Sequence, residues 1–175
     1  KITGNIKALL VNTGSANAGN GAKGIEDAET TCKFLASELN VNHNKVLPFS
    51  TGVIMSPLPV GKIKKSIPNL IKDLKDNNWL DASEAIMTTD TIPKAISKAV
   101  LIADQKVNIT GISKGAGMIH PNMATMLAFI GTDANISLDM LQNINKEIVN
   151  LTFNCISVDG DSSTNDSFML ISSNQ

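Results

Sequence analysis

The chain has 175 residues, of which 42% are apolar and 18% are charged, a composition that predicts a packed core rather than disorder. Fifteen lysines and no arginine face sixteen acidic residues, so the chain lacks the basic surplus that nucleic-acid binding requires. At roughly 100–200 residues per domain, the length corresponds to one domain or part of one, here taken as a single partial domain over residues 1–175.

The first third of the chain predicts one strand, one loop and one amphipathic helix. A short apolar run over 6–12 reads as a buried strand, and the glycine- and asparagine-rich segment 13–24 reads as a loop. The helix is expected over 25–39. One helical stripe carries its apolar residues, which are Ile25, Ala28, Cys32, Leu35 and Leu39.

A second strand and a second helix follow. The strand is expected over 46–49, where the segment 50–52 interrupts it, and prolines then mark a turn. Apolar residues recur at helical spacing over 60–74. Because Pro68 lies inside this pattern, we expect a kink or two short helices.

The second half of the chain completes the alternation. A short helix is expected over 79–87, and two paired strands over 95–103 and 107–113. A helix over 138–153 follows, and the segment 168–172 is either a final strand or the start of a helix. Two residues could cap the 138–153 helix, Ser137 or Asp139. Strands that alternate with amphipathic helices indicate the α/β class.

The two cysteines indicate a reducing environment. Cys32 and Cys155 lie far apart inside apolar stretches, so we expect two buried, reduced thiols and no disulfide framework. No apolar run reaches the roughly 18 residues of a membrane span. The expectation is a cytoplasmic protein that binds neither nucleic acid nor membrane.

Residues 114–127, Lys-Gly-Ala-Gly-Met-Ile-His-Pro-Asn-Met-Ala-Thr-Met-Leu, carry the most suggestive chemistry. A small residue, Ala124, precedes Thr125, and a tight loop leads into the apolar run that follows. This layout is typical of a precursor that cleaves itself before a threonine, whose freed α-amine then serves as base for its own hydroxyl. On spacing alone, the alternative is an ordinary β-branched residue at the head of a strand. A phosphate-binding loop is excluded because the required spacing of glycines and lysine is absent.

Five segments in order carry a resemblance to a known family. KGAGMIHPNMATML resembles the processing motif of the bifunctional ornithine acetyltransferases, or glutamate N-acetyltransferases, of arginine biosynthesis. The segments VNTGSANAGNG, FSTGVI, AIMTTDT and SVDGDSSTND each resemble a segment of the same family. The resemblance implies layered sheets between helices, similar to N-terminal-nucleophile hydrolases but with a different chain path.

The resemblance also implies a cleavage site and a catalytic group. The scissile bond is Ala124–Thr125, which divides the chain into the end of an α chain, 1–124, and the start of a β chain, 125–175. Thr125 is the implied nucleophile and acetyl acceptor, and Thr51 and Gly52 are the implied oxyanion donors.

Substrate binding is implied at two further positions. The motif lysine carries over to Lys114, which suits the α-carboxylate of an amino acid. A threonine of the TTDT segment carries over to Thr91, although Thr88 and Thr89 stand beside it.

Two other groups of residues receive a structural interpretation. Asp159, Asp161 and Asp166 could suggest a cation site, but their spacing lacks the features of a calcium loop and the family needs no metal. His120 and His43 are assigned to loops rather than to catalysis. No cofactor is implied, although some family members use acetyl-CoA as a second acetyl donor.

The predicted function is acetyl transfer from N²-acetylornithine to glutamate through an acetyl-threonine, in an α₂β₂ assembly. An N-terminal-nucleophile aminopeptidase is the enzymatic alternative, and a fragment that only packs against or regulates a full-length copy is the other. Family precursors are longer than this chain, and further substrate-binding residues are expected beyond Gln175. The isolated chain is therefore expected to be incomplete and inactive alone.

Overall fold

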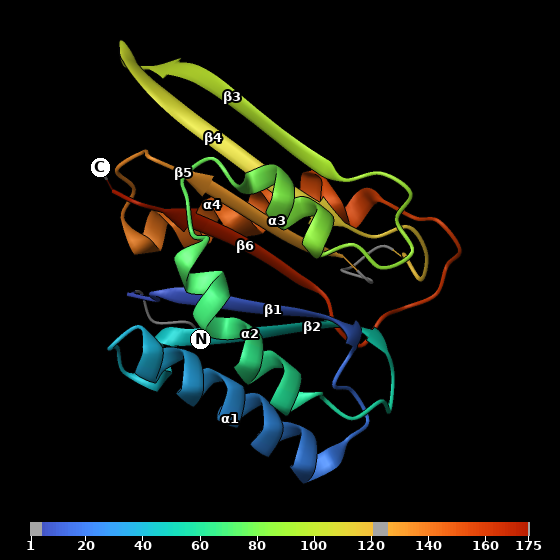
Figure 1. Ribbon diagram of the computed structural model, residues 1–175. Helices are drawn as coiled ribbons and strands as arrows, with labels where there is room; N and C mark the ends of the chain where they lie inside the picture. Colours follow the sequence, from blue (N-terminus) through green and yellow to red (C-terminus); the bar gives the residue numbers. More distant parts are fainter. Residues whose placement is uncertain (1–4, 121–125, 175) are drawn as a thin grey trace. The chain divides into compact units, whose positions relative to one another are not determined.

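The computed structural model describes residues 5–120 and 126–174 (Figure 1). It contains two compact units, Lys1–Asp76 and Asn77–Gln175, each with its own sheet. The expected single domain over 1–175 and its division between residues 124 and 125 stay predictions. The mixed α/β class is confirmed.

The first unit is built on two parallel strands joined by a helix. Strands β1 (Ala8–Ser15) and β2 (Val46–Val53) pair from Ala8 with Val46 onward, and helix α1 (Gly21–Glu38) connects them. A parallel pair needs such a crossover, because a tight turn cannot return the chain to the same end. The predicted strands and helix are therefore confirmed. The predicted loop over 13–24 is wrong at both ends, since β1 runs to Ser15 and α1 begins at Gly21.

Strand β2 also continues past the predicted interruption. The segment 50–52 was expected to end the strand, yet it pairs with the segment 12–14 of β1. The prediction was wrong because a glycine that weakens an isolated strand is accommodated here by a partner strand that can approach it closely.

Helix α1 buries one stripe in the core of the first unit. Cys32, Leu35 and Ala36 are buried together with Val46 of β2 and Ile67, a residue of helix α2 (Val60–Lys72). Ile25 departs from the predicted stripe, because it is 64% exposed. The buried side of α1 is thus shifted by about one residue toward Gly24 and Asp27, which are buried instead.

Helix α2 contains Pro68 without dividing into two helices. It is one element from Val60 to Lys72, and Ile67 next to the proline is fully buried. The expected division into two short helices is therefore wrong, because packing of this face against α1 outweighs the hydrogen bond that the proline removes.

The second unit is a four-stranded sheet in the order β3-β4-β5-β6. Its strands are β3 (Lys94–Ile102), β4 (Gln105–Lys114), β5 (Leu127–Thr132) and β6 (Ser167–Ser172). The first three are antiparallel neighbours, and β6 runs parallel to β5. The segment 168–172, for which a strand and a helix were both open, is therefore a strand.

The predicted hairpin of β3 and β4 turns at two residues. Ala103 and Asp104 both have positive φ, 48° and 63°, which matches the right-handed twist of the flanking strands. All nine residues of β3 are exposed.

Two helices flank this sheet on opposite faces. Helix α3 (Trp79–Ala85) brings its tryptophan within contact distance of Gly131 on β5. Helix α4 (Leu138–Leu151) contacts β6, and the turn after it places Phe153 edge-on against Phe168 with ring centroids 4.9 Å apart. Phe168 pairs with Ala128, an odd number of residues from Gly131, so it belongs to the other face.

Three remaining predictions concern the residue that caps α4 and the burial of the two cysteines. Ser137 caps α4, because its hydroxyl accepts the amide of Met140, whereas Asp139 lies in the first turn. Cys32 is a buried free thiol as expected. Cys155 is free but exposed, so its predicted burial is wrong; its thiol lies 3.1 Å from the carbonyl oxygen of Asn150.

Among the described residues, none of the helices is long and apolar enough to cross a membrane.

Candidate active site

The five motif segments gather into two groups, one in each unit. In the first unit, the segment after β1 lies beside the segment at the end of β2, where the carboxyl ends of two parallel strands meet. In the second unit, the other three segments are joined by hydrogen bonds that backbone amides donate to carboxylates. Thr51 and Gly52 belong to the first group, and Lys114 and Thr91 belong to the second.

Backbone pairing holds the first group together. It continues beyond the ends of the strands, where the amide of Ala16 donates to the carbonyl of Val53 at 3.0 Å. The amide of Met55 in turn donates to the carbonyl of Ala18 at 2.8 Å. Thr51 lies within this paired region and is 4% exposed.

Gly52 requires the absence of a side chain. Its φ is +134°, a value that L side chains rarely adopt. A Cβ built on it would lie 2.4 Å from the carbonyl carbon of Gly14 on the neighbouring strand. Two glycines at one register position therefore let the two backbones approach each other at the end of the sheet.

Neutral polar side chains complete this group. The hydroxyl of Ser50 donates to Asn12 Oδ1 at 2.6 Å, and the Asn12 amide donates to the carbonyl of Ser15 at 2.9 Å. The Ser15 hydroxyl donates to the carbonyl of Ser56 at 2.8 Å. Asn20 donates to that same carbonyl, so the loop before α1 is fixed to the chain after β2.

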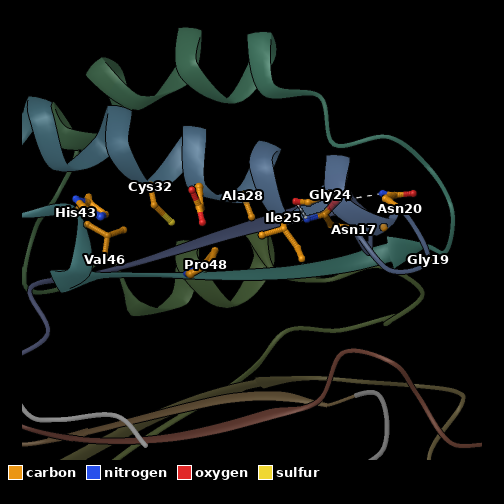
Figure 2. Close-up of a pocket in the computed structure, with 12 residues that line it drawn as sticks. Asn17, Gly19, Asn20, Gly24, Ile25, Ala28, Cys32, His43, Val46 and Pro48 are labelled. Atoms are coloured by element: carbon orange, nitrogen blue, oxygen red, sulfur yellow. Dashed lines mark hydrogen bonds between the residues drawn. The ribbon is translucent and has the colours of Figure 1, made fainter.

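A cavity of about 510 Å³ lies beside this group (Figure 2). Figure 2 shows Ala28 and Cys32 pointing from α1 toward Val46 and Pro48, with Asn17 at the start of the helix. None of its lining residues is a predicted site residue. Burial raises the pKa of the Cys32 thiol to about 11, so this sulfur is a poor nucleophile at neutral pH.

In the second unit, three strand ends meet at one edge of the sheet. Lys114, the last residue of β4, pairs with Leu127, and Leu127 pairs with Ser167, the first residue of β6. The motif lysine, the chain that follows Thr125 and the chain that follows Asp166 are therefore neighbours in space.

Lys114 is buried at the end of strand β4. It is 2% exposed. Burial lowers the pKa of its ammonium group, and Lys94 acts in the same direction, while Asp90 and Asp166 oppose them. A buried cation is tolerated only beside such carboxylates.

Asp90 joins two of the motif segments. Its carboxylate, which has no exposed area, accepts the amide of Gly115 at 2.8 Å and the ammonium of Lys94 at 2.5 Å, as well as the amide of Thr88 at 3.4 Å. Burial alone would raise the pKa of Asp90, but these hydrogen bonds outweigh it and hold the pKa below its usual value. Gly115, which follows Lys114, has φ +147°, a backbone conformation that favours glycine.

Asp159 and Asp166 hold the remaining motif segments. Asp159 accepts the amides of Met118 at 2.5 Å and Ile119 at 2.8 Å, and these bonds lower the pKa of its carboxyl group. Asp166 accepts the amide of Met126 at 3.0 Å, directly after Thr125 in the sequence. Among the residues that the structure describes, no three His, Cys, Asp or Glu side chains are grouped in a way that could hold a metal ion.

The other predicted residues are placed as follows. Ala124 and Thr125 lie outside the described residues, so the cleavage site and nucleophile stay predictions. Thr91 is exposed, as are Thr88 and Thr89, so exposure does not separate the three threonines. The two histidines, His120 and His43, are both exposed, and His43 lines the cavity of the first unit.

Sequence reasoning missed the anchoring carboxylates. Asp159 and Asp166 drew attention only as candidate metal ligands, and Asp90 was not singled out. An acidic residue within a glycine-rich or threonine-rich motif is a usable signal, because such segments offer backbone amides that a carboxylate can accept.

Comparison with known proteins places these segments in a family. The model of the ArgJ family matches residues 1–175. The arginine biosynthesis bifunctional protein ArgJ of Colwellia psychrerythraea strain 34H is 57% identical over 166 residues, which cover 95% of this chain and 39% of that protein. The chain thus spans about two fifths of the length of this curated relative.

Two solved structures are also similar. The arginine biosynthesis bifunctional protein ArgJ of Bacillus halodurans matches with 38% identity and a TM-score of 0.58, over 66% of this chain and 61% of that one. An ornithine acetyltransferase of Mycobacterium tuberculosis, solved in complex with ornithine, matches with 30% identity and a TM-score of 0.60, over 65% and 61% respectively. With the family model matching from end to end, the chain belongs to the ArgJ family.

Proposed function

We propose that the full-length protein containing this chain transfers the acetyl group of N²-acetylornithine to glutamate. Membership of the ArgJ family supports this assignment, as does the similarity to an ornithine acetyltransferase crystallised with ornithine. The observation that carries most weight is the arrangement of residues at one edge of the second sheet. There the buried cation of Lys114 lies beside the strand that follows Thr125. We propose that Lys114 supplies a partner for a substrate carboxylate at this edge, and that Thr125, which precedes β5 in the sequence, supplies the reacting group.

The chemistry begins with processing of the precursor. The hydroxyl of Thr125 attacks the carbonyl carbon of Ala124, which transfers the acyl group from nitrogen to oxygen. Water then hydrolyses the resulting ester and leaves Thr125 as a new N-terminus. The hydrogen bond from the Met126 amide to Asp166 supports this step, because it fixes the backbone immediately after the nucleophile.

Acetyl transfer then follows a two-step route. The Thr125 hydroxyl attacks the acetyl carbonyl of N²-acetylornithine, its proton passes to the α-amine, and ornithine leaves with a proton on its nitrogen. The amine of glutamate next attacks acetyl-Thr125 and regenerates the hydroxyl. Thr51 and Gly52 are proposed to donate to the oxyanion in each step, since losing one such donor typically lowers turnover about 10²–10³-fold. Lys114 and Thr91 are proposed to bind substrate.

The proposed assembly is α₂β₂, and the proposed reaction needs no cofactor. Incubation with acetyl-CoA and glutamate tests for the second acetyl donor, because de novo acetylglutamate appears only if acetyl-CoA is used.

The test is to capture the acetyl-enzyme of the full-length protein. After incubation with N²-acetylornithine, mass spectrometry should find one acetyl group on the peptide that begins at Thr125, and glutamate should remove it. Thr30→Ala, in α1, is a matched control that should acetylate normally. Release of N-terminal amino acids from peptides without acetyl capture would instead support an aminopeptidase.

A further inference from the structure

Among the residues that the structure describes, Asp90 is a carboxylate that connects the two proposed substrate-binding segments. It directly precedes Thr91 in the sequence, and it accepts the amide of Gly115, which directly follows Lys114. The Gly115 hydrogen bond is 2.8 Å long and buried. Asp90 therefore connects the backbone that follows Lys114 to the segment that contains Thr91.

The surroundings of Asp90 give it a further electrostatic role. Its side chain is buried, whereas that of Lys94 on the same ion pair is 43% exposed. The charged groups that influence Lys114 are Asp90 and Asp166, which favour its protonated form, and Lys94, which disfavours it. Asp90 thus faces two cations, one partly in solvent and one buried.

Building on the proposed function, we propose that Asp90 is a positioning residue for the recognition of substrate carboxylates. It holds the backbone at Gly115, the residue after Lys114, and it favours the charged form of the buried Lys114 ammonium. It does so without touching the substrate. The ligand class follows from the group it serves, because a buried ammonium selects an anionic group such as the α-carboxylate of an amino acid.

The first test is Asp90→Asn in the full-length protein. Asparagine keeps the shape and an oxygen that can accept the Gly115 amide, but it removes the charge. With one favourable carboxylate lost, the pKa of Lys114 falls further. The pH above which KM for acetylornithine begins to rise should therefore move to a lower value than in the wild type. The pH dependence of kcat should not shift in the same way. Asp104→Asn, at the exposed hairpin turn, is the matched control and should leave the profile unchanged.

The second test shifts the pKa of Lys114 in the opposite direction. Lys94→Met removes the cation that disfavours protonation of Lys114, so the same limb of the KM profile should move to higher pH. Because Lys94 is partly exposed, this variant keeps the test valid even where Asp90→Asn does not fold. A purely structural role of the Asp90–Lys94 pair would instead lower stability in both variants without moving the two profiles in opposite directions.

The outcomes separate this inference from the function on which it rests. Opposite shifts in the two variants support it. A wild-type enzyme that transfers acetyl groups, with unchanged KM profiles in both variants, overturns the role of Asp90 alone. A wild-type full-length protein that transfers no acetyl group overturns the proposed function and this inference with it.

Discussion

The two groups of motif segments are held by different forces. In the first unit, the chain around Gly14 and Gly52 is fixed by backbone pairing and by neutral side chains. In the second unit, Asp90, Asp159 and Asp166 each accept one or more backbone amides. The first arrangement depends on shape and the second on charge, so substitutions and pH should affect them differently.

The largest expected effect is a steric one in the first unit. Gly52→Val places a Cβ 2.4 Å from a backbone carbon that cannot move aside, at a φ of +134°. Overpacking and backbone strain together should destabilise the first unit by about 3 kcal/mol or more. Processing and turnover should fall with it. Denaturation of the full-length protein, followed by cleavage and activity assays, measures the effect.

Gly61→Ala is the matched control for that variant. Gly61 lies near the start of α2, and a Cβ there meets nothing within 4 Å. Alanine favours helix over glycine, so this variant should be as stable as wild type or slightly more stable. Equal stability of Gly52→Val and Gly61→Ala would contradict the close approach of the two strands.

The second prediction concerns the buried cation of the second unit. Lys114→Met keeps the length of the side chain and removes its charge. KM for the amino-acid substrates should rise about 10–100-fold, which corresponds to the loss of one charge-assisted contact. Lys146→Met, at an exposed position of α4, should leave KM unchanged. Processing must be measured first, and a correctly processed Lys114→Met enzyme with wild-type KM would remove Lys114 from the substrate site.

The third prediction separates the two groups by pH. The pKa values of Asp90 and Asp159 are lowered in the folded protein, so their stabilising effect is present above the unfolded value of about 3.9 and is lost as pH falls through the folded values. Amide protection at Gly115 and Ile119 should therefore fall below about pH 4. Protection at Met55, whose amide is bonded to a backbone carbonyl, should persist.

Hydrogen exchange corrected for intrinsic rates is the appropriate measurement. Simultaneous loss of protection in both groups would mean that acid unfolds the whole protein rather than releasing the carboxylate-held segments.

The smallest expected effect is the loss of a neutral hydrogen bond in the first unit. Ser50→Ala removes the donor to Asn12 and should lower stability by about 1 kcal/mol at all pH values. Ser66→Ala, on the exposed side of α2, should cost less, because alanine is a better helix former. A loss in Ser50→Ala that depended strongly on pH would contradict the neutral character of this group.

Local sequence patterns predicted the elements whose stability is local. The hairpin of β3 and β4 and the capped helix α4 were both expected, since β-branched residues and a serine cap act over a few residues. The extension of β2 through Gly52 was not expected, because it depends on Gly14 in a distant part of the chain. The prediction of two short helices around Pro68 was wrong for the same reason, since burial of Ile67 overrides the tendency of proline to end a helix.

The candidate site was predictable only as a set of motifs. The resemblance indicated Lys114 and Thr51 as site residues. Neither spacing nor composition indicated that Lys114 would be buried, or that Asp90 would accept the amide of Gly115, the residue that follows Lys114. Such contacts arise from strand register, which brings together segments that are far apart in the sequence.

The most direct test of the account is the intact mass of the purified full-length protein. Cleavage at the proposed bond predicts two fragments, the second of which begins at Thr125. Thr125→Ala should remain one uncut and inactive chain, and Thr125→Ser should retain some cleavage because it keeps the hydroxyl. A wild-type fragment that begins at any other residue, or an active Thr125→Ala enzyme, would contradict the assignment of Thr125 as the group that performs both steps.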